Sequence, residues 1–298
     1  MKKMKSGRLS KKVAVALVLL ALLSAAVPVN AHMPGAKAPP AFKLPSIVIS
    51  DGGEEIEITI EDVGKYHNEQ MKEFKRKMLK KQNKTDEEIE KIIAKEFAGA
   101  TGMCPCTSAA FRAALLGISK VWGNEIPERA DIKIISRLPT PGSMQCFQYI
   151  TGTGQGIPNV KSKGEFRMIL PDGTEVTDFS IKNIKKLSAS INTSNYNFVI
   201  IRKSTGEKFE VRVKEDVFPQ DFFELRKKVK VKKTATQEEI DKFRKEWEAV
   251  RNAFLTQPDW RLFEGIEKPK KDRAILFLLG VMVFGLVLAF IYDKKKAG

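Results

Sequence analysis

The sequence predicts a single α+β domain that lies between two hydrophobic end segments. Stretches that alternate between apolar and polar residues, as half-buried strands do, are interspersed with longer amphipathic stretches of helical period. Short turn sequences join several of the strand-like stretches, which indicates hairpins. Both ends of the 298-residue chain are strongly apolar, so the folded body is shorter than the chain.

Residues 1–31 are predicted to be a secretory signal peptide. Residues 1–12 carry six cations and no acidic residue, and an apolar run of 15 residues follows at Val13–Val27. Small residues at the end of the segment suit cleavage by a signal peptidase, so we expect the mature chain to begin near His32. An uncleaved anchor is the alternative, but the run is shorter than the roughly 20 residues that a spanning helix needs.

Residues 32–55 are predicted to form a flexible linker and entry segment, because Pro, Ala and Gly dominate its first part. Residues 56–60 alternate as a strand does. Residues 61–98 have the charged, amphipathic pattern of a helical hairpin that breaks near its middle and restarts at Thr85. Glu88 follows Thr85 by three residues, which is the pattern of a capping box.

The remaining elements of the body follow from the same criteria. Helices are expected at residues 107–118, 142–150, 221–230 and 236–255. A strand is expected at residues 131–138, and strand–turn–strand patterns at residues 166–177 and 198–213. We expect Thr107 or Ser108 to cap the first of these helices and Gly152 to end the second. The apolar stripe of the last helix is expected to pack in the core.

Ala274–Tyr292 is predicted to cross a membrane once. These 19 residues include no charge and no proline, and at ~1.5 Å per residue they reach roughly 28 Å, close to the hydrocarbon thickness of a bilayer. Three lysines follow at once, so residues 293–298 are expected to form a cytoplasmic tail. Together with the signal peptide, this segment predicts a single-pass protein of the cell membrane, held in the lipid by its C-terminal helix, whose body is extracytoplasmic.

The body carries an excess of positive charge. Of the formal net charge of +16, +8 lies on residues 32–273, which favours an anionic lipid surface or another anionic partner. Nucleic acid is not expected as a partner, because no interleaved basic and aromatic motif is present. Asn83 and Asn192 fit the glycosylation pattern.

The three cysteines are the strongest candidates for chemistry. Cys104-Pro105-Cys106 comes directly before a predicted helix, where the helix dipole and unpaired backbone N–H groups lower a thiol pKa. Arg112, one to two turns further on, is expected to add to this field. Thiolates bind soft metals, so Cys104, Cys106 and Cys146 are candidate ligands of zinc or another thiophilic metal, although their spacing is not that of a zinc ribbon.

Two structural interpretations of the cysteines also remain open. Outside the cytoplasm an odd number of cysteines leaves at least one without an intramolecular partner. A bridge between Cys104 and Cys106 would be strained, whereas a bridge from either of them to Cys146 is the simpler alternative. The second interpretation is that all three are inert core residues, as buried cysteines often are.

Other candidate residues have a plainer alternative beside the functional one. His67 is one of only two histidines, and by default it is a solvated residue of the charged helix. Gly152 and Thr153 begin a glycine-rich stretch whose N–H groups are candidates for binding an anionic cofactor, although a helix cap and turn is the simpler interpretation. A Ser-His-Asp hydrolase triad is not indicated with so few histidines.

Four stretches match, in order, the motifs of one known family. They are an acidic-aromatic-His stretch at residues 60–67, the Cys-Pro sequence and Arg-containing helix of residues 102–114, the Gln-x-x-Thr-Gly segment of residues 148–152, and the helix and Leu-Phe tail of residues 236–263. Over about residues 56–267 the chain therefore resembles the FmdE domain family of formylmethanofuran dehydrogenase. The resemblance implies one α+β domain with a candidate metal-binding pocket in its Cys/His region, and a helical insertion at residues 68–100.

The chain also departs from the motifs of that family. Gly102 stands where the family has a His before the cysteine, so His67 can supply this imidazole only if the insertion folds away and brings its flanks together. Cys106 replaces a glycine of the family. The family's second cysteine falls near Gly142, so Cys146 is not its direct equivalent. Cys104 alone is carried over without change.

The leading functional hypothesis is a membrane-tethered, extracytoplasmic module that binds a metal or acts in redox chemistry, with Cys104 at its centre. Cys106, Cys146 and His67 are its further candidate metal ligands, and Arg112, Gly152 and Thr153 its candidate cofactor-binding residues. A second hypothesis is a component of a membrane oxidoreductase complex in one-carbon or respiratory metabolism, whose partner subunits supply the cofactor. A third is a non-catalytic surface or assembly protein with structural disulfides.

Overall fold

The structure is a computed structural model that describes residue 33 and residues 35–269. The predicted signal peptide, membrane-spanning segment and cytoplasmic tail lie outside these residues. Within the described part, no helix combines the length and the apolar character that a membrane crossing requires.

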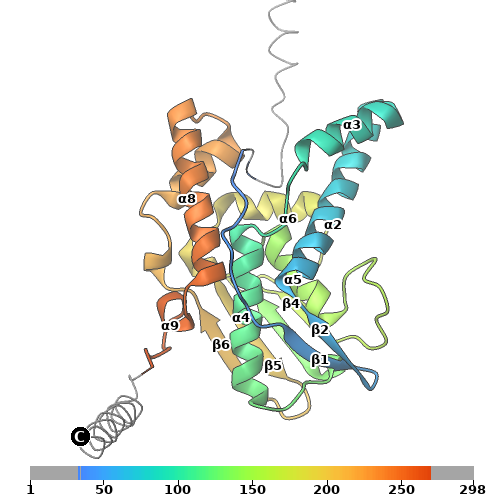
Figure 1. Ribbon diagram of the computed structural model, residues 1–298, viewed down its shortest axis with the longest axis vertical. Helices are drawn as coiled ribbons and strands as arrows, with labels where there is room; N and C mark the ends of the chain where they lie inside the picture. Colours follow the sequence, from blue (N-terminus) through green and yellow to red (C-terminus); the bar gives the residue numbers. More distant parts are fainter. Residues whose placement is uncertain (1–32, 34, 270–298) are drawn as a thin grey trace, which may run out of the picture.

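A four-stranded mixed sheet forms the base of the fold (Figure 1). Its strands run in the order β4-β3-β5-β6, with β3 and β4 parallel and the other two pairs antiparallel. A separate antiparallel hairpin, β1–β2, turns at two glycines of positive φ. The strands span Ile47–Asp51 (β1), Glu54–Ile58 (β2), Ile132–Ser136 (β3), Glu165–Met168 (β4), Asn197–Arg202 (β5) and Lys208–Arg212 (β6).

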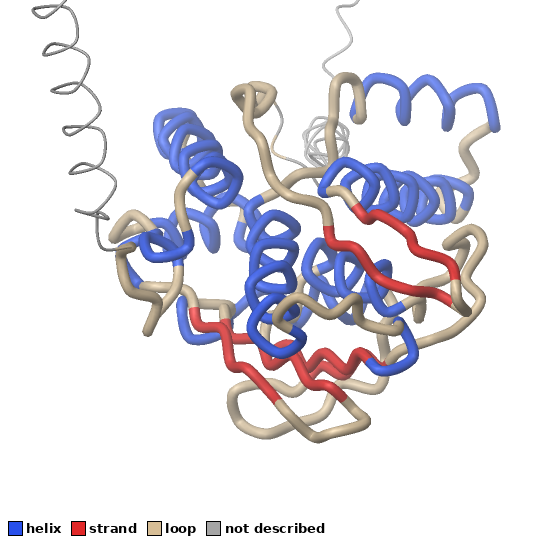
Figure 2. The backbone as a smooth tube through the Cα atoms, turned by 60° about the horizontal axis from the view of Figure 1, so that its bottom comes forward, coloured by secondary structure: helices blue, strands red, loops and turns tan. Residues whose placement is uncertain are grey.

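Helices cover one face of this sheet in two layers (Figure 2). In the inner layer α4 packs on β5 and β6, and α5 packs on β3 and β4; in the outer layer α2 lies against α5, and α8 lies against α4. The larger helices are Ile60–Lys80 (α2), Asp86–Glu96 (α3), Pro105–Trp122 (α4), Pro141–Thr151 (α5) and Gln237–Thr256 (α8). The shorter ones are Ile181–Leu187 (α6), Phe222–Arg226 (α7), which continues into a π-helix at Lys227–Lys232, and Asp259–Leu262 (α9).

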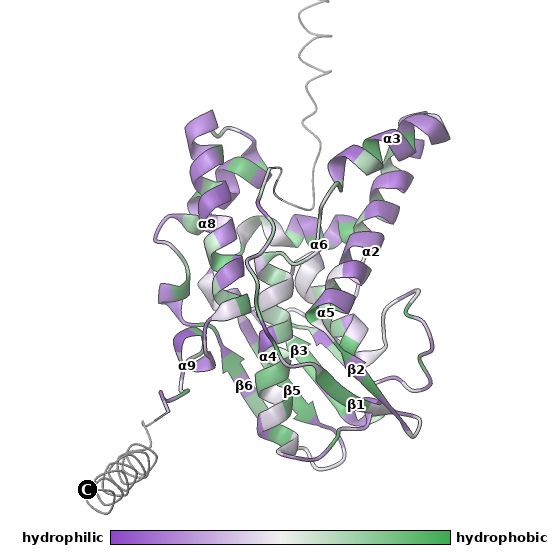
Figure 3. Ribbon diagram, in the orientation of Figure 1, coloured by the Kyte–Doolittle hydropathy of each residue, from purple (hydrophilic) through white to green (hydrophobic). Residues whose placement is uncertain are grey.

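The α+β class is confirmed, and most elements form where the sequence places them. The helical hairpin of α2 and α3, with the Thr85–Glu88 capping box, is confirmed. So are the strands β3, β5 and β6 and the ends of α5 and α8. In Figure 3 the projecting ends of α2, α3 and α8 are hydrophilic, whereas the strands and α4 are mainly hydrophobic, as the amphipathic pattern predicts.

Three expectations require correction. Neither Thr107 nor Ser108 caps α4: its N-cap is Cys104, three or four residues earlier, because Pro105 suits the first helical position. Only the first half of the 166–177 pattern forms a strand, and the rest is a turn with one isolated bridge. The segment 32–55, expected as linker and entry, includes the buried strand β1.

Strand β1 is fixed to the body by a buried ion pair. Arg129 donates to the Asp51 carboxylate at 2.6 Å, and both side chains are almost fully buried. Asp51 also accepts hydrogen bonds from the backbone N–H groups of Lys161 and Ser162 and from the Ser162 hydroxyl. Burial of this pair is tolerated because both oxygens of the Asp51 carboxylate are hydrogen-bonded, although Arg129 Nε has no hydrogen-bond partner among the described residues. These bonds give the hairpin one well-defined position on the body.

A contact between two glycines sets the position of α2. Gly102, with φ of +75°, lies so close to α2 that an added Cβ would be 1.9 Å from the carbonyl oxygen of Gly64. On the other side, a Cβ on Gly64 would be 2.4 Å from the carbonyl oxygen of Thr101. One turn along α2, Asn68 Nδ2 donates to the Ala100 carbonyl at 2.6 Å. The backbone before α4 therefore lies directly against α2.

We predict that Gly102→Ala destabilises the fold by about 3 kcal/mol, since the methyl group adds overpacking to the cost of a left-handed conformation. The free energy of unfolding from urea denaturation of the full-length protein checks this. Gly99→Ala is the matched control: its φ is +65°, but nothing lies within 4 Å of the added Cβ, so only about 1 kcal/mol should be lost. Equal losses in the two variants would show that the glycine contact is unimportant.

Candidate functional site

A cavity of about 170 Å³ lies where the N-terminal ends of α4 and α5 meet α2, α7 and α8. Cys104 and Cys106 line it from α4, and His67 and Met71 line it from α2. Cys104 and His67, both candidate ligands from the sequence, therefore line one cavity, which is the condition set above for His67 to supply the imidazole. This arrangement depends on the glycine contact described above, because His67 lies one turn after Gly64 and Cys104 two residues after Gly102.

The N-termini of two helices converge on the Cys104 sulfur. Cys104 is the N-cap of α4. The first turn of α5 lies so close that a Cβ on Gly142 would be 2.8 Å from Cys104 Sγ and 2.5 Å from Thr107 Oγ1. The positive ends of both helix dipoles therefore face this sulfur and favour its thiolate form.

Hydrogen bonds stabilise the same thiolate. Together, the Cys106 thiol, which is the largest contribution, and the Thr107 hydroxyl and backbone N–H lower the pKa of Cys104 to about 6, against the opposing effect of burial. The Thr107 hydroxyl and N–H lie 3.1 Å and 3.4 Å from Cys104 Sγ. Cys106 stays protonated, because donating to Cys104 and burial raise its pKa. The Tyr196 hydroxyl in turn donates to Cys106 Sγ at 3.5 Å.

His67 is buried and neutral, which corrects its interpretation as a solvated surface residue. Its exposed fraction is 2%, and burial lowers the pKa of its imidazole. The Nδ1 atom is hydrogen-bonded to Gln145 Oε1. Because an amide oxygen only accepts, this bond places the proton on Nδ1 and fixes the tautomer of the ring.

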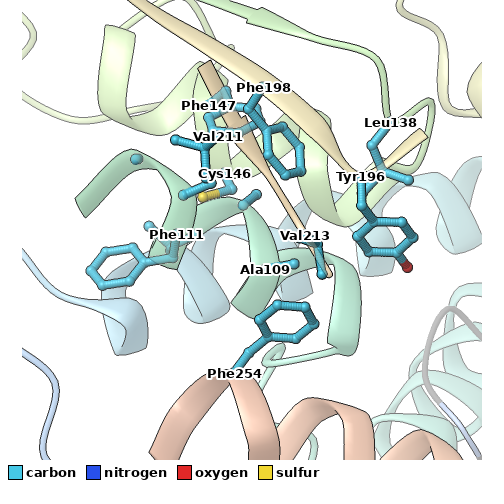
Figure 4. Close-up of a cluster of buried hydrophobic side chains, with 14 of the residues drawn as sticks. Ala109, Phe111, Leu138, Cys146, Phe147, Tyr196, Phe198, Val211, Val213 and Phe254 are labelled. Carbon is cyan, nitrogen blue, oxygen red and sulfur yellow. The ribbon is translucent and has the colours of Figure 1, made fainter. Parts of the chain in front are cut away.

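Cys146 lies apart from the cavity. Its side chain is fully buried among Phe147, Phe198 and Val211 in the core between α4, α5 and the sheet (Figure 4). Burial raises the pKa of its thiol. All three cysteines are free thiols, so the alternative of a bridge to Cys146 is not found. Across residues 33 and 35–269, no three His, Cys, Asp or Glu side chains converge as a ready-made metal site.

The role expected for Arg112 is wrong. Its guanidinium donates to the carbonyl oxygens of Phe254 and Gln257, each at 2.9 Å, and pairs with Asp259 at 2.5 Å. The side chain therefore satisfies the last carbonyl groups of α8 rather than the thiolate, as cations at helix C-termini commonly do.

Gly152 and Thr153 lie at the opposite end of α5 from the cavity. Gly152 is the left-handed C-cap of this helix, and its N–H group and that of Thr153 donate to carbonyl oxygens of the last turn. Since α5 has 11 residues, the two ends are separated by roughly 16 Å. The structure thus places these two residues in a helix cap and does not bring them to the thiols.

Three cations of the cavity wall could not be assigned to the site from the sequence. Lys185 comes from α6, Arg226 from α7 and Lys230 from the π-helix. Burial is the main cause that lowers the pKa of Lys185 and of Lys230 to about 8, so both are mostly charged at pH 7. The lysine-rich sequence of residues 226–233 is the only signal that points to two of them.

The segment that carries the thiols and the cationic wall also carries a family signature. The family model described as FmdE, Molybdenum formylmethanofuran dehydrogenase operon, matches residues 100–264. The chain belongs to the FmdE family. The match runs from the segment before α4 to the end of α9, so it includes Cys104 and the cationic wall but not His67 on α2. No curated protein and no solved structure matches the chain.

We predict that Cys104 is alkylated at its half-maximal rate near pH 6 and loses reactivity as the pH falls through this value, because only the thiolate reacts. In Cys106→Ala the midpoint should rise toward the ordinary thiol value near 9, since the main donor is gone. Cys106→Ser keeps a donor and serves as the control. The pH dependence of iodoacetamide labelling, read at Cys104 by mass spectrometry, checks this; an unchanged midpoint in Cys106→Ala would contradict it.

Proposed function

We propose that the chain is a membrane-tethered, extracytoplasmic FmdE-family module that binds a thiophilic metal ion through Cys104, with Cys106 as the second sulfur. One observation carries the proposal: two sulfurs, one of them at the convergence of two helix N-termini, share a cavity with an imidazole. Soft sulfur ligands select ions such as zinc or copper(I).

The donor set of the cavity fits such an ion. Cys104, Cys106 and the Met71 thioether are soft ligands, and His67 adds a borderline one. Among the described residues that line the cavity, none is Asp or Glu, so hard ions such as calcium and magnesium do not fit. Two thiolates would offset the charge of the ion. The cations of the cavity wall, Lys185, Arg226 and Lys230, would in turn stabilise the negative charge of the thiolates.

The protein groups around the sulfurs have defined tasks in this proposal. Cys106 would lose its proton to solvent on binding such an ion, since only thiolates are ligands. Tyr196 keeps its hydrogen bond to Cys106 Sγ and so orients that sulfur. Gln145 holds the His67 ring through Nδ1. A bound ion of this kind supplies Lewis acidity or electron transfer at the cavity.

Thiol redox exchange is a second candidate, as part of a membrane oxidoreductase complex. It is favoured by the hydrogen bond from the Cys106 thiol to the Cys104 thiolate and by the dehydrogenase operon in the family description. The Cys104 thiolate would attack a disulfide of a partner protein, and Cys106 would then displace the mixed disulfide. The partner's disulfide gains the two electrons that Cys104 and Cys106 lose, and it is protonated by the Cys106 proton and by one proton from solvent.

We predict that full-length protein, purified anaerobically in detergent, holds about one equivalent of zinc or copper, and that Cys104→Ser lowers this at least tenfold, since ligand loss removes most of the affinity. Elemental analysis with free-thiol titration measures it. Cys146→Ala is the control, because Cys146 lies outside the cavity, and it should keep the metal. Metal-free protein in which Cys104 and Cys106 titrate reversibly as a disulfide would favour the redox candidate instead.

The membrane tether rests on the sequence of residues 1–31 and 274–292. We predict that protease added to intact cells digests the body down to a small membrane-embedded fragment. Immunoblotting against the body and against the C-terminal tail follows the digestion. Inverted vesicles, in which only the short tail is accessible, are the control. Digestion of the body in inverted vesicles alone would overturn the proposed orientation.

A further inference from the structure

The cavity wall opposite the thiols is unusually positive. Lys185, Arg226 and Lys230 all line the cavity, and no acidic side chain of the described residues lines it with them. The N-terminal ends of α4 and α5 add their positive dipoles at the same place. Like charges brought together in a partly enclosed space repel one another, and the single Cys104 thiolate offsets only part of this positive charge.

Two cations of the same helical segment, Lys228 and Arg226, differ in their carboxylate partners. Lys228 pairs with Glu239 at 2.7 Å and with Glu224 at 3.7 Å. Arg226, two residues earlier, makes no ion pair with any carboxylate in residues 33 and 35–269. Lys185 likewise makes no ion pair there: the Glu96 carboxylate acts on it only at longer range, and its ammonium lies 4.5 Å from the centre of the Phe74 ring. The two cations without an ion pair, Arg226 and Lys185, therefore both lie on the cavity wall.

The remaining wall of the cavity is apolar and aromatic. Phe222, Phe243 and Trp247 come from α7 and α8. A volume of about 170 Å³ is slightly larger than the cavity of about 150 Å³ that accepts benzene in an engineered protein core. The cavity is thus large enough for on the order of six to nine non-hydrogen atoms, with a charged end and an apolar end.

We propose that the cavity binds a small organic carboxylate, with the carboxylate among Lys185, Arg226 and Lys230, its apolar part against Phe222, Phe243 and Trp247, and its free end beside the Cys104 sulfur. This rests on the proposed function in that the anion is the molecule presented to the Cys104 centre. Guanidinium and ammonium groups are the usual partners of carboxylates, and the planar fork of Arg226 suits a two-point contact.

The test compares two alkylating reagents of nearly equal size, anionic iodoacetate and neutral iodoacetamide, on metal-free, reduced full-length protein. Both react with the same Cys104 thiolate, so the ratio of their rate constants cancels the thiolate fraction and reports only the charge of the cavity. We expect this ratio, relative to that of glutathione, to be raised about tenfold or more at low salt by attraction of the anion. It should fall as salt is added.

Substitutions locate the effect. Arg226→Gln should lower the ratio at least threefold, whereas Lys228→Gln, which removes an outward cation paired with Glu239, should leave it unchanged. Benzoate should protect Cys104 from iodoacetamide, and its neutral counterpart benzamide should not. If Arg226→Gln fails to fold, two measurements on the wild-type protein still test the proposal: the salt dependence of the rate ratio and the protection of Cys104 by benzoate. A ratio equal to that of glutathione, with no protection by benzoate, would overturn the proposal.

The metal analysis separates this proposal from the one on which it rests. If the protein binds metal through Cys104 but shows no preference for iodoacetate, the carboxylate site alone is refuted. Protein that prefers iodoacetate but binds no metal would retain the carboxylate site and refute the metal centre.

Discussion

The close approach of two backbones at Gly64 and Gly102 is the constraint on which the site depends. Because neither residue has a Cβ, α2 lies directly against the segment that leads into α4. This contact brings His67 and Cys104 to the same cavity from separate parts of the chain. It also gives a physical reason for a departure from the family motif: a histidine at position 102 would not fit here, and α2 delivers an imidazole from another direction.

Local hydrogen bonds, more than distant charges, determine the protonation states of Cys104 and Cys106. A pKa lowered from 9.0 to about 6 corresponds to roughly 4 kcal/mol in favour of the Cys104 thiolate. Hydrogen bonds to a charged group contribute about 1.5–3 kcal/mol each, and a helix terminus about 0.3–1 kcal/mol. The bonds from Cys106 and Thr107 are therefore sufficient without Arg112, which is committed to the end of α8. The Cys-x-Cys spacing matters because it makes one sulfur the donor to the other.

The sequence predicts the elements of this fold better than it predicts which side chains meet. Period and capping residues are local properties, so the α2–α3 hairpin, α5 and α8 follow from them. The predicted cap of α4 is wrong because cysteine is not a usual N-cap, although Pro105 points to the earlier start. Cys104 stands out in the sequence as a candidate, but the burial of His67 and the grouping of Lys185 with Arg226 depend on tertiary contacts that no local pattern reveals.

Helix α5 is held at both ends. Its first turn packs on the thiol centre through Gly142, and its C-cap Gly152 lies against the side chain of Arg129, the partner of Asp51. Each residue added to an α-helix turns everything beyond it by about 100°. Insertion or deletion of a single residue in α5 would thus misalign either the contact at Gly142 or the contact at Gly152. The outer part of the α2–α3 hairpin takes part in neither contact. Homologous chains should therefore conserve the length of α5 strictly while varying freely in the length of that projecting arm.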